Sequence, residues 1–110
     1  MAEASPFPRW RLLAPLRAGG AEQMALDQSL LEHASAPGFV PTLRFQVWAP
    51  PALSLGRFQD IAEIDLEACA REKIEVVRRP TGGKGILHLD DFTYSLVLPR
   101  VYPLPESVVE

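Results

Sequence analysis

The chain is short of three things: cysteine, positive charge and long apolar runs. Its single cysteine, Cys69, excludes an internal disulfide and suits the reducing cytoplasm, where we expect the protein to reside. A net charge of -3 argues against a nucleic-acid surface, which is normally basic. No apolar run approaches the roughly 20 residues of a membrane helix, and the N-terminus lacks the basic and apolar regions of a signal peptide. We therefore expect neither nucleic acid nor membrane as a partner.

The composition is ordinary for one small globular domain. A chain of 110 residues can bury one modest core but not two. Hydrophobic content of 47% and charged content of 23% are typical of globular proteins. The 11 prolines lie mainly between apolar runs, which predicts short strands with well-marked turns. Residues 1–8 are small, polar and proline-rich, and we expect them to be disordered.

Hydrophobic periodicity predicts short strands and two helices. A helix is expected at residues 22–33, directly after a glycine pair, and a second at 65–73 with Asp65 as its N-cap. In the second helix Leu66, Cys69 and Ala70 should form a buried stripe, so we interpret Cys69 as buried and inert. Strands are expected at residues 10–16, 43–48, 52–55, 74–77 and 92–98.

Residues 76–88 (VVRRPTGGKGILH) hold the most informative pattern in the chain. A glycine pair can adopt backbone angles closed to other residues, and its exposed N–H groups can cradle a phosphate or carboxylate. Arg78, Arg79 and Lys84 add positive charge around it, although alternation along a strand turns only one arginine toward a pocket. A simple hairpin with solvated arginines accounts for the spacing as well. The pattern has the spacing of neither a P-loop nor a dinucleotide-binding motif.

Three blocks of the sequence resemble one known family. Residues 78–88 (RRPTGGKGILH), followed by 92–95 (FTYS), resemble the signature of the lipoate–protein ligase A and octanoyltransferase family, which is related to the biotin–protein ligases. Residues 21–31 (AEQMALDQSLL) resemble its first helix, and 43–59 (LRFQVWAPPALSLGRFQ) its next strand pair. The resemblance implies an α+β fold, with a mixed, largely antiparallel sheet and helices on one side. It also implies that residues 1–110 are the N-terminal part of a catalytic domain.

The resemblance implies acyl transfer in protein lipoylation. Members of this family attach a lipoyl or octanoyl group to a lysine of a lipoyl acceptor domain, which is the expected partner protein. One branch activates the free acid with ATP, and the other takes the acyl chain from a carrier thioester. We expect no tightly bound cofactor and no metal site. ATP and Mg²⁺ would be needed only by a ligase-type enzyme.

The resemblance also suggests a site with two parts. An apolar tunnel would be lined by Phe45, Val47, Trp48, Leu53 and Leu55. The candidate substrate- or nucleotide-binding residues are Trp48, Arg78, Arg79, Gly82, Gly83, Lys84, Gly85, Ile86, Leu87 and His88.

Three of the singled-out residues have plainer interpretations. Trp48 could be ordinary core, and His88 a structural residue at the pocket edge. Asp27 could be a solvent-facing or locally hydrogen-bonded carboxylate, whereas the resemblance places it near the pocket entrance, holding the binding strands together.

Two departures from the family pattern bear on activity. Lys84 and Gly85 stand where ligases carry glycine and alanine, and the retained positive charge favours the transferase branch. The family's catalytic lysine belongs to a later segment, and neither Lys73 nor Lys84 is in its context. We therefore expect no catalytic residue in this chain and little activity from it alone, with a missing C-terminal segment or a second chain completing the site.

Alternative functions stay open at this point. The chain could be a catalytically inactive acyl- or nucleotide-binding module, or a fragment of an ATP-dependent lipoate ligase. Biotin ligase activity is less favoured, because the Gly-Arg-Gly pattern of those enzymes is absent. Residues 105–110 (PESVVE) look like the first turn of a helix, which suggests a fragment.

Overall fold

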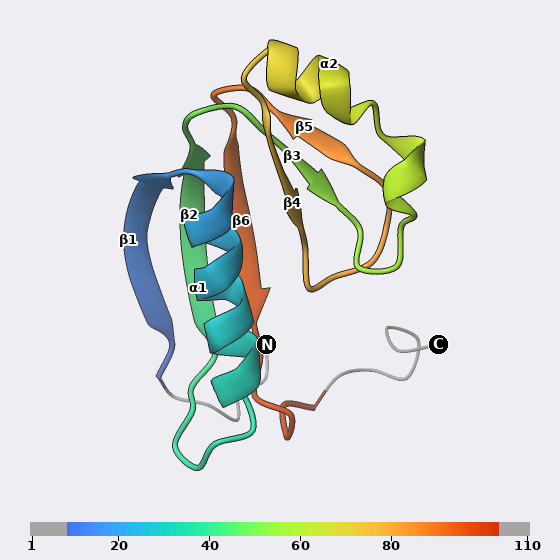
Figure 1. The fold of residues 1–110 in the computed structure, drawn as a ribbon. Coiled ribbons are helices and arrows are strands. Elements are labelled where there is room, and N and C mark those ends of the chain that lie inside the picture. The colour runs from blue at the N-terminus through green and yellow to red at the C-terminus, as the bar shows by residue number, and fades with distance from the viewer. Residues whose placement is uncertain (1–8, 104–110) are drawn as a thin grey trace, which may run out of the picture.

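The computed structural model describes residues 9–103 (Figure 1). In chain order the elements are β1 (Arg11–Ala18), α1 (Gly20–His33), β2 (Thr42–Trp48), β3 (Ala52–Leu55), the 3-10 helix η1 (Ile61–Glu63), α2 (Leu66–Arg71), β4 (Glu75–Arg78), β5 (Ile86–His88) and β6 (Phe92–Val97). Each helix and strand predicted from the sequence has a counterpart, and the predicted α+β class is confirmed. The predictions for residues 1–8 and 105–110 lie outside the described part of the chain.

The strands form two three-stranded sheets, in the orders β1-β2-β6 and β4-β3-β5. Each sheet combines one parallel pair (β1 with β2, β3 with β4) and one antiparallel pair (β2 with β6, β3 with β5). The mixed character predicted for the sheet is confirmed, but the strands are divided between two small sheets. Pro50 and Pro51 separate β2 from β3, because proline has no N–H to continue a ladder.

Helix α1 lies against the first sheet (Figure 1) and also contacts β3 and β4 of the second. At its N-terminus Gly20 packs so tightly on the second sheet that a Cβ there would lie 2.8 Å from Glu75 Oε1 and 3.2 Å from the Cβ of Ala52. The Ala21 N–H donates to Glu75 Oε1 at 3.0 Å, which places a carboxylate at the positive end of the helix. The glycine pair before the helix therefore permits close packing as well as a turn.

The buried apolar residues form two small clusters along α1. Near its C-terminus Leu30 and Ala34 pack with Phe39 and Val97. Toward its N-terminus, a second cluster contains Met24, Trp48 and Ala52. Since the second cluster draws on both sheets, burial of apolar surface fixes their relative position.

The predicted buried stripe on the second helix is wrong. Its N-cap is confirmed, because Asp65 Oδ1 accepts from the Ala68 N–H at 3.0 Å. However, Leu66 is 47% exposed, Ala70 is exposed and Cys69 is only half-buried. The helix ends at Arg71, and six residues give less than two turns to pack against β4.

Strand β2 turns its polar residues inward. Its buried side chains are Thr42, Arg44, Gln46 and Trp48. The alternating Leu43, Phe45 and Val47 are only half-buried and occupy the opposite face. The neighbouring strand β6 follows the same pattern, with Phe92 and Tyr94 exposed by 62% and 69%. The predicted half-buried strand is confirmed, but the face toward α1 is the polar one.

Candidate functional site

A pocket of about 480 Å³ that opens to solvent lies between α1 and both sheets. This volume is in the range of small-molecule sites, roughly 300–1,000 Å³. The wall consists of Met24, Asp27 and Leu31 from α1, Gln46 and Trp48 from β2, Arg79 to Thr81 after β4, Ile86 and His88 from β5, and residues 93–98. The pocket therefore has both apolar and polar walls, from segments far apart in the sequence.

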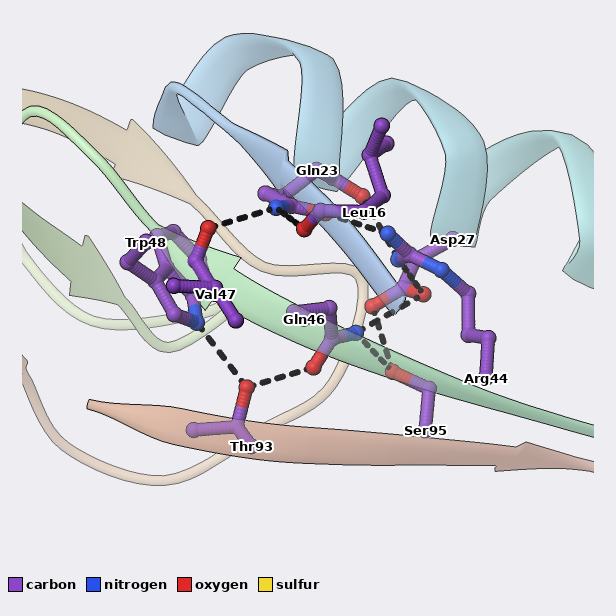
Figure 2. A network of polar contacts seen from close by, with 9 residues as sticks. All are labelled: Leu16, Gln23, Asp27, Arg44, Gln46, Val47, Trp48, Thr93 and Ser95. Carbon is purple, nitrogen blue, oxygen red and sulfur yellow. Dashed lines mark hydrogen bonds and ion pairs between the residues drawn. The ribbon is translucent and has the colours of Figure 1, made fainter. Parts of the chain in front are cut away.

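The Asp27 carboxylate is the centre of a polar network on one side of the pocket (Figure 2). It accepts hydrogen bonds from Arg44 Nη1 at 2.6 Å, Ser95 Oγ at 2.9 Å and Gln46 Nε2 at 3.5 Å. Arg44 is 1% exposed, so its charge is compensated inside the protein and not by water. Asp27 is thus not a solvated carboxylate: it links α1 to β2 and β6 at the pocket wall.

Gln23 anchors the other end of this network. Its amide nitrogen donates to the carbonyl oxygens of Leu16 at 2.9 Å and Val47 at 3.2 Å (Figure 2). Its amide oxygen accepts from Arg44 Nη2. Gln23 is fully buried, so these bonds satisfy it while they tie α1 to β1 and β2.

Trp48 joins the network through its indole N–H, which donates to Thr93 Oγ1 at 2.9 Å (Figure 2). The Thr93 hydroxyl in turn donates to the side-chain oxygen of Gln46. Because each donor has its acceptor, the polar wall is preorganised. The rest of the indole ring then forms part of the apolar wall of the pocket.

Arg79 holds the glycine-rich loop with its guanidinium. Nη1 donates to the Ser54 carbonyl at 2.7 Å and to Ser54 Oγ at 2.9 Å. Nη2 donates to the carbonyls of Gly82 and Lys84, both at 2.9 Å. Burial lowers the pKa of Arg79 from its usual value. The residue brings positive charge to the pocket wall while it fixes the loop to β3.

Arg78 also donates to main-chain carbonyls. Its Nη1 lies 2.9 Å from the Gly56 oxygen and 2.7 Å from the Gln59 oxygen. With Arg57 and Arg79 it lines a second hollow of about 280 Å³, which shares Leu31, Arg79 and Pro80 with the pocket. The two arginines occupy different surroundings, as strand alternation predicts, and the hollow beside the pocket is cationic.

The glycine-rich loop comes very close to Gly56, the residue that follows β3. A Cβ at Gly56 would lie 1.8 Å from the Gly83 carbonyl oxygen, so only glycine fits there. Gly83 itself has φ +97°, a conformation that other residues rarely adopt. Gly82, by contrast, has open space around its Cα and no positive φ. The loop shape therefore depends on Gly56 and Gly83.

His88 lies between the two sheets. Its ring stacks on Trp48, with centroids 3.8 Å apart and planes inclined by 5°. Its Nε2 is 2.9 Å from Ser54 Oγ, and its Nδ1 is 2.8 Å from Asp91 Oδ2. The ring is 4% exposed. Both ring nitrogens are thus engaged within the protein, and His88 forms part of the pocket wall.

The structure brings some of the sequence-predicted site residues together and leaves others apart. Four line the pocket: Trp48, Arg79, Ile86 and His88. Six do not: Arg78, Gly82, Gly83, Lys84, Gly85 and Leu87. The expectation that Phe45, Val47, Leu53 and Leu55 line an apolar tunnel is wrong for this pocket, because β2 turns Phe45 and Val47 to the other face. Binding by any of these residues stays a prediction.

Several wall residues were missed by the sequence analysis. They include Met24, Gln46, Thr93 and Ser95. The available signal was the alternation of polar residues on residues 43–48 and 92–97, which is consistent with a polar inner face as well as with a solvated one. Pairing of β2 with β6 in register, which places Gln46 opposite Thr93, is a tertiary feature.

The geometry suits an elongated apolar ligand with an anionic or polar end. Met24, Leu31, Trp48 and Ile86 supply apolar wall, while Arg79 and the adjoining hollow supply positive charge. A nucleophile is not evident among the pocket-lining residues: Cys69 is on α2, outside the wall, and Ser54 is fully buried. The described residues support binding more readily than bond-breaking chemistry.

The sequence model of the lipoyl protein ligase A/B catalytic domain matches residues 20–109. The chain therefore belongs to this family. Among curated proteins it is 44% identical over 103 residues to an octanoyltransferase LipM of Anoxybacillus flavithermus and 42% identical over 103 residues to that of Bacillus subtilis. Both alignments cover 92% of this chain and 37% of the relative. The chain thus spans little more than a third of the length of these relatives.

Solved structures agree with this assignment. A lipoate protein ligase of T. acidophilum with bound lipoic acid is 30% identical, with a TM-score of 0.59 over 78% of this chain and 36% of that one. A lipoate-protein ligase A bound with ATP is 31% identical, with a TM-score of 0.61 over 78% and 35%. A third, described as a bi-partite lipoate protein ligase with its E2 lipoyl domain, also from T. acidophilum, is 30% identical with a TM-score of 0.60 over 78% and 34%.

Within residues 9–103 the structure contains no helix long and apolar enough to span a bilayer.

Proposed function

We propose that this chain supplies the substrate-binding part of an enzyme that transfers an octanoyl or lipoyl group to a lysine of a lipoyl acceptor domain. The observation that carries the proposal is the pocket of about 480 Å³, whose wall combines apolar side chains with Arg79. Membership of the lipoyl ligase family and the LipM relatives support it.

The acyl chain is the part of the substrate that this pocket fits best. Burying the six methylenes of an octanoyl chain at about 0.8 kcal/mol each would contribute about 5 kcal/mol. Trp48 and Ile86 would contact the chain, and the carboxyl or thioester end would lie toward Arg79. The loop of Gly82, Gly83 and Lys84 does not line the pocket, so its main-chain N–H groups would meet only the part of the donor that extends beyond Arg79.

We propose that the reaction itself needs residues outside this chain. Lys84 is 80% exposed and lies 3.5 Å from Glu63, while Lys73 is in the turn after α2. Neither lines the pocket. A cationic group beside the acyl carbonyl, which would stabilise developing negative charge, would come from a C-terminal segment or a second chain. The division into two parts described for a related ligase is consistent with this arrangement.

The second candidate is the ATP-dependent ligase reaction. The cationic hollow formed by Arg57, Arg78 and Arg79 favours it, because three arginines beside an acyl pocket suit a nucleotide phosphate. A related ligase was solved with ATP bound. In that case ATP with Mg²⁺ would be a substrate, and Lys84 would add to the charge at the loop.

Separate calorimetric titrations of the 110-residue chain with octanoate, lipoate and Mg-ATP test these proposals. Binding of octanoate or lipoate supports the acyl-binding proposal, and strong ATP binding favours the ligase over the transferase. If no acyl ligand binds, the acyl-binding proposal is wrong. The chain is then incubated with an octanoyl donor and an apo acceptor domain, and the acceptor is weighed. A mass gain at an enzyme-like rate would contradict the need for further residues.

A further inference from the structure

Four side chains, two of which line the pocket, form a continuous line of hydrogen bonds. Arg79 Nη1 lies 2.9 Å from Ser54 Oγ, which lies 2.9 Å from His88 Nε2. His88 Nδ1 lies 2.8 Å from Asp91 Oδ2. Ser54 is fully buried and His88 is 4% exposed. The line connects a carboxylate after β5 to the guanidinium that holds the glycine-rich loop.

One arrangement of protons gives every member of this line a hydrogen-bond partner. A guanidinium can only donate, so Ser54 Oγ accepts from Arg79. The single hydroxyl proton of Ser54 then points to His88 Nε2, the only acceptor found for it in the described residues. In this arrangement the His88 ring carries its proton on Nδ1, where it donates to Asp91. The direction of donation is Arg79 to Ser54 to His88 to Asp91.

The combination of serine, histidine and aspartate is not a nucleophilic triad here. Ser54 has no exposed surface and does not line the pocket. Its oxygen is already occupied by Arg79 at 2.9 Å. A substrate carbonyl has no access to it, so the line of hydrogen bonds acts on Arg79 and not on a reacting atom.

Arg79 links this line of hydrogen bonds to the glycine-rich loop. Its remaining Nη donors contact the Gly82 and Lys84 carbonyls, and Gly83 between them packs on Gly56. His88 is held in its ring plane by Trp48, whose indole is fixed by Thr93. Rotation of the guanidinium would therefore break contacts on both sides of the loop.

We propose that Asp91, His88 and Ser54 are positioning residues, which orient Arg79 and the glycine-rich loop for the carboxylate end of a medium-chain fatty acyl group. The proposal deepens the proposed acyl-binding function and rests on it for the identity of the ligand. Asp91 Oδ1 is buried and has no hydrogen-bond partner among residues 9–103. The interaction found for this carboxylate is therefore the one between Oδ2 and His88 Nδ1, which suits Asp91 to a positioning role.

The test is a double-mutant cycle with Ser54→Ala and Asp91→Ala in the 110-residue chain. Among residues 9–103 the hydrogen bonds connect Ser54 to Asp91 through His88, so a shared line predicts non-additive losses. Each single variant should weaken octanoate binding by about three- to tenfold, as expected for one lost hydrogen bond. The double variant should lose little more than either single one. Asp90→Asn is the charge control, since the exposed Asp90 lies beside Asp91 in sequence and is not among the residues that line the 480 Å³ pocket.

Two NMR measurements decide the proposal independently of octanoate. Nitrogen-15 spectra should show His88 in the neutral form with its proton on Nδ1, and this form should decrease in Asp91→Ala. Amide resonances of Gly82, Gly83 and Lys84 should move in both alanine variants but not in Asp90→Asn. A His88 protonated on Nε2 in the parent chain, multiplicative losses in the double variant, or an unmoved loop would overturn the proposal. If octanoate fails to bind while the NMR results hold, the acyl-binding function is wrong and the positioning of Arg79 stands.

Discussion

The rings of Trp48 and His88 stack with their centroids 3.8 Å apart and their planes inclined by 5°. Trp48 ends β2 in the first sheet and His88 ends β5 in the second, so this pair joins the sheets beside the pocket. The polar edge of each ring is hydrogen-bonded, Trp48 to Thr93 and His88 to Ser54 and Asp91. The contact therefore fixes both the distance between the sheets and the orientation of each ring.

We expect Trp48→Ala to destabilise the chain by roughly 3–5 kcal/mol, the usual cost of truncating a buried aromatic residue. Trp48→Phe keeps part of the stack but loses the bond to Thr93, and should cost less. Trp10→Ala is the control, because Trp10 is 46% exposed and should cost roughly 1 kcal/mol. Urea unfolding followed by circular dichroism measures all three. Equal losses at the two tryptophans would contradict a structural role for the stack.

Ile86→Glu should abolish or strongly weaken octanoate binding, because it places a carboxylate at the apolar wall of the pocket. Leu87→Glu is a matched control. Both residues are on β5 and both are 48% exposed, but Leu87 does not line the pocket. Calorimetric titration of octanoate into each variant measures the difference. Similar affinities in the two variants would place the ligand elsewhere.

Asp27→Ala should destabilise the fold by roughly 3–5 kcal/mol, because it leaves the Arg44 charge buried without its carboxylate. Glu63→Ala breaks the other type of ion pair, between an exposed Glu63 and an exposed Lys84 at 3.5 Å. That variant should change stability by less than about 1 kcal/mol. Chemical denaturation compares the two. A small loss at Asp27 would contradict the dependence of the buried Arg44 charge on this carboxylate.

Gly56→Ala should displace the glycine-rich loop, because the added methyl would lie 1.8 Å from the Gly83 oxygen. We expect a stability loss of at least about 1–3 kcal/mol and weakened binding of any anionic ligand at the loop. Gly82→Ala has open space and no positive φ, and should be close to neutral. Thermal unfolding together with amide spectra of the loop checks both variants. A neutral Gly56→Ala would show that β3 and the loop are not in contact in solution.

Local features of the fold could be predicted from the sequence. The helix after Gly19 and Gly20, the Asp65 cap and the strand at residues 43–48 follow from composition and periodicity, which depend on near neighbours. The division of the strands between two sheets could not be predicted from the sequence, because strand pairing joins residues that are distant in the chain. The exposure of Leu66 also depends on how little surface α2 has to pack against.

The candidate site was only half accessible to sequence reasoning. The sequence blocks 43–59 and 78–88 point to four residues that do line one pocket: Trp48, Arg79, Ile86 and His88. The use of Arg79 could not be read from its sequence neighbours. Its guanidinium contacts the carbonyls of Ser54, Gly82 and Lys84, and the first of these is 25 residues away in the chain.

The sequence by itself determined which residues alternate along β2, where the chain turns and which motif places arginines beside glycines. Only the tertiary structure decided which face of β2 is inside. Arg44 and Gln46 can be buried because α1 brings Gln23 and Asp27, and β6 brings Ser95, to satisfy their hydrogen bonds. Burial of a polar side chain depends on partners, and those partners come from segments that meet only when the chain folds.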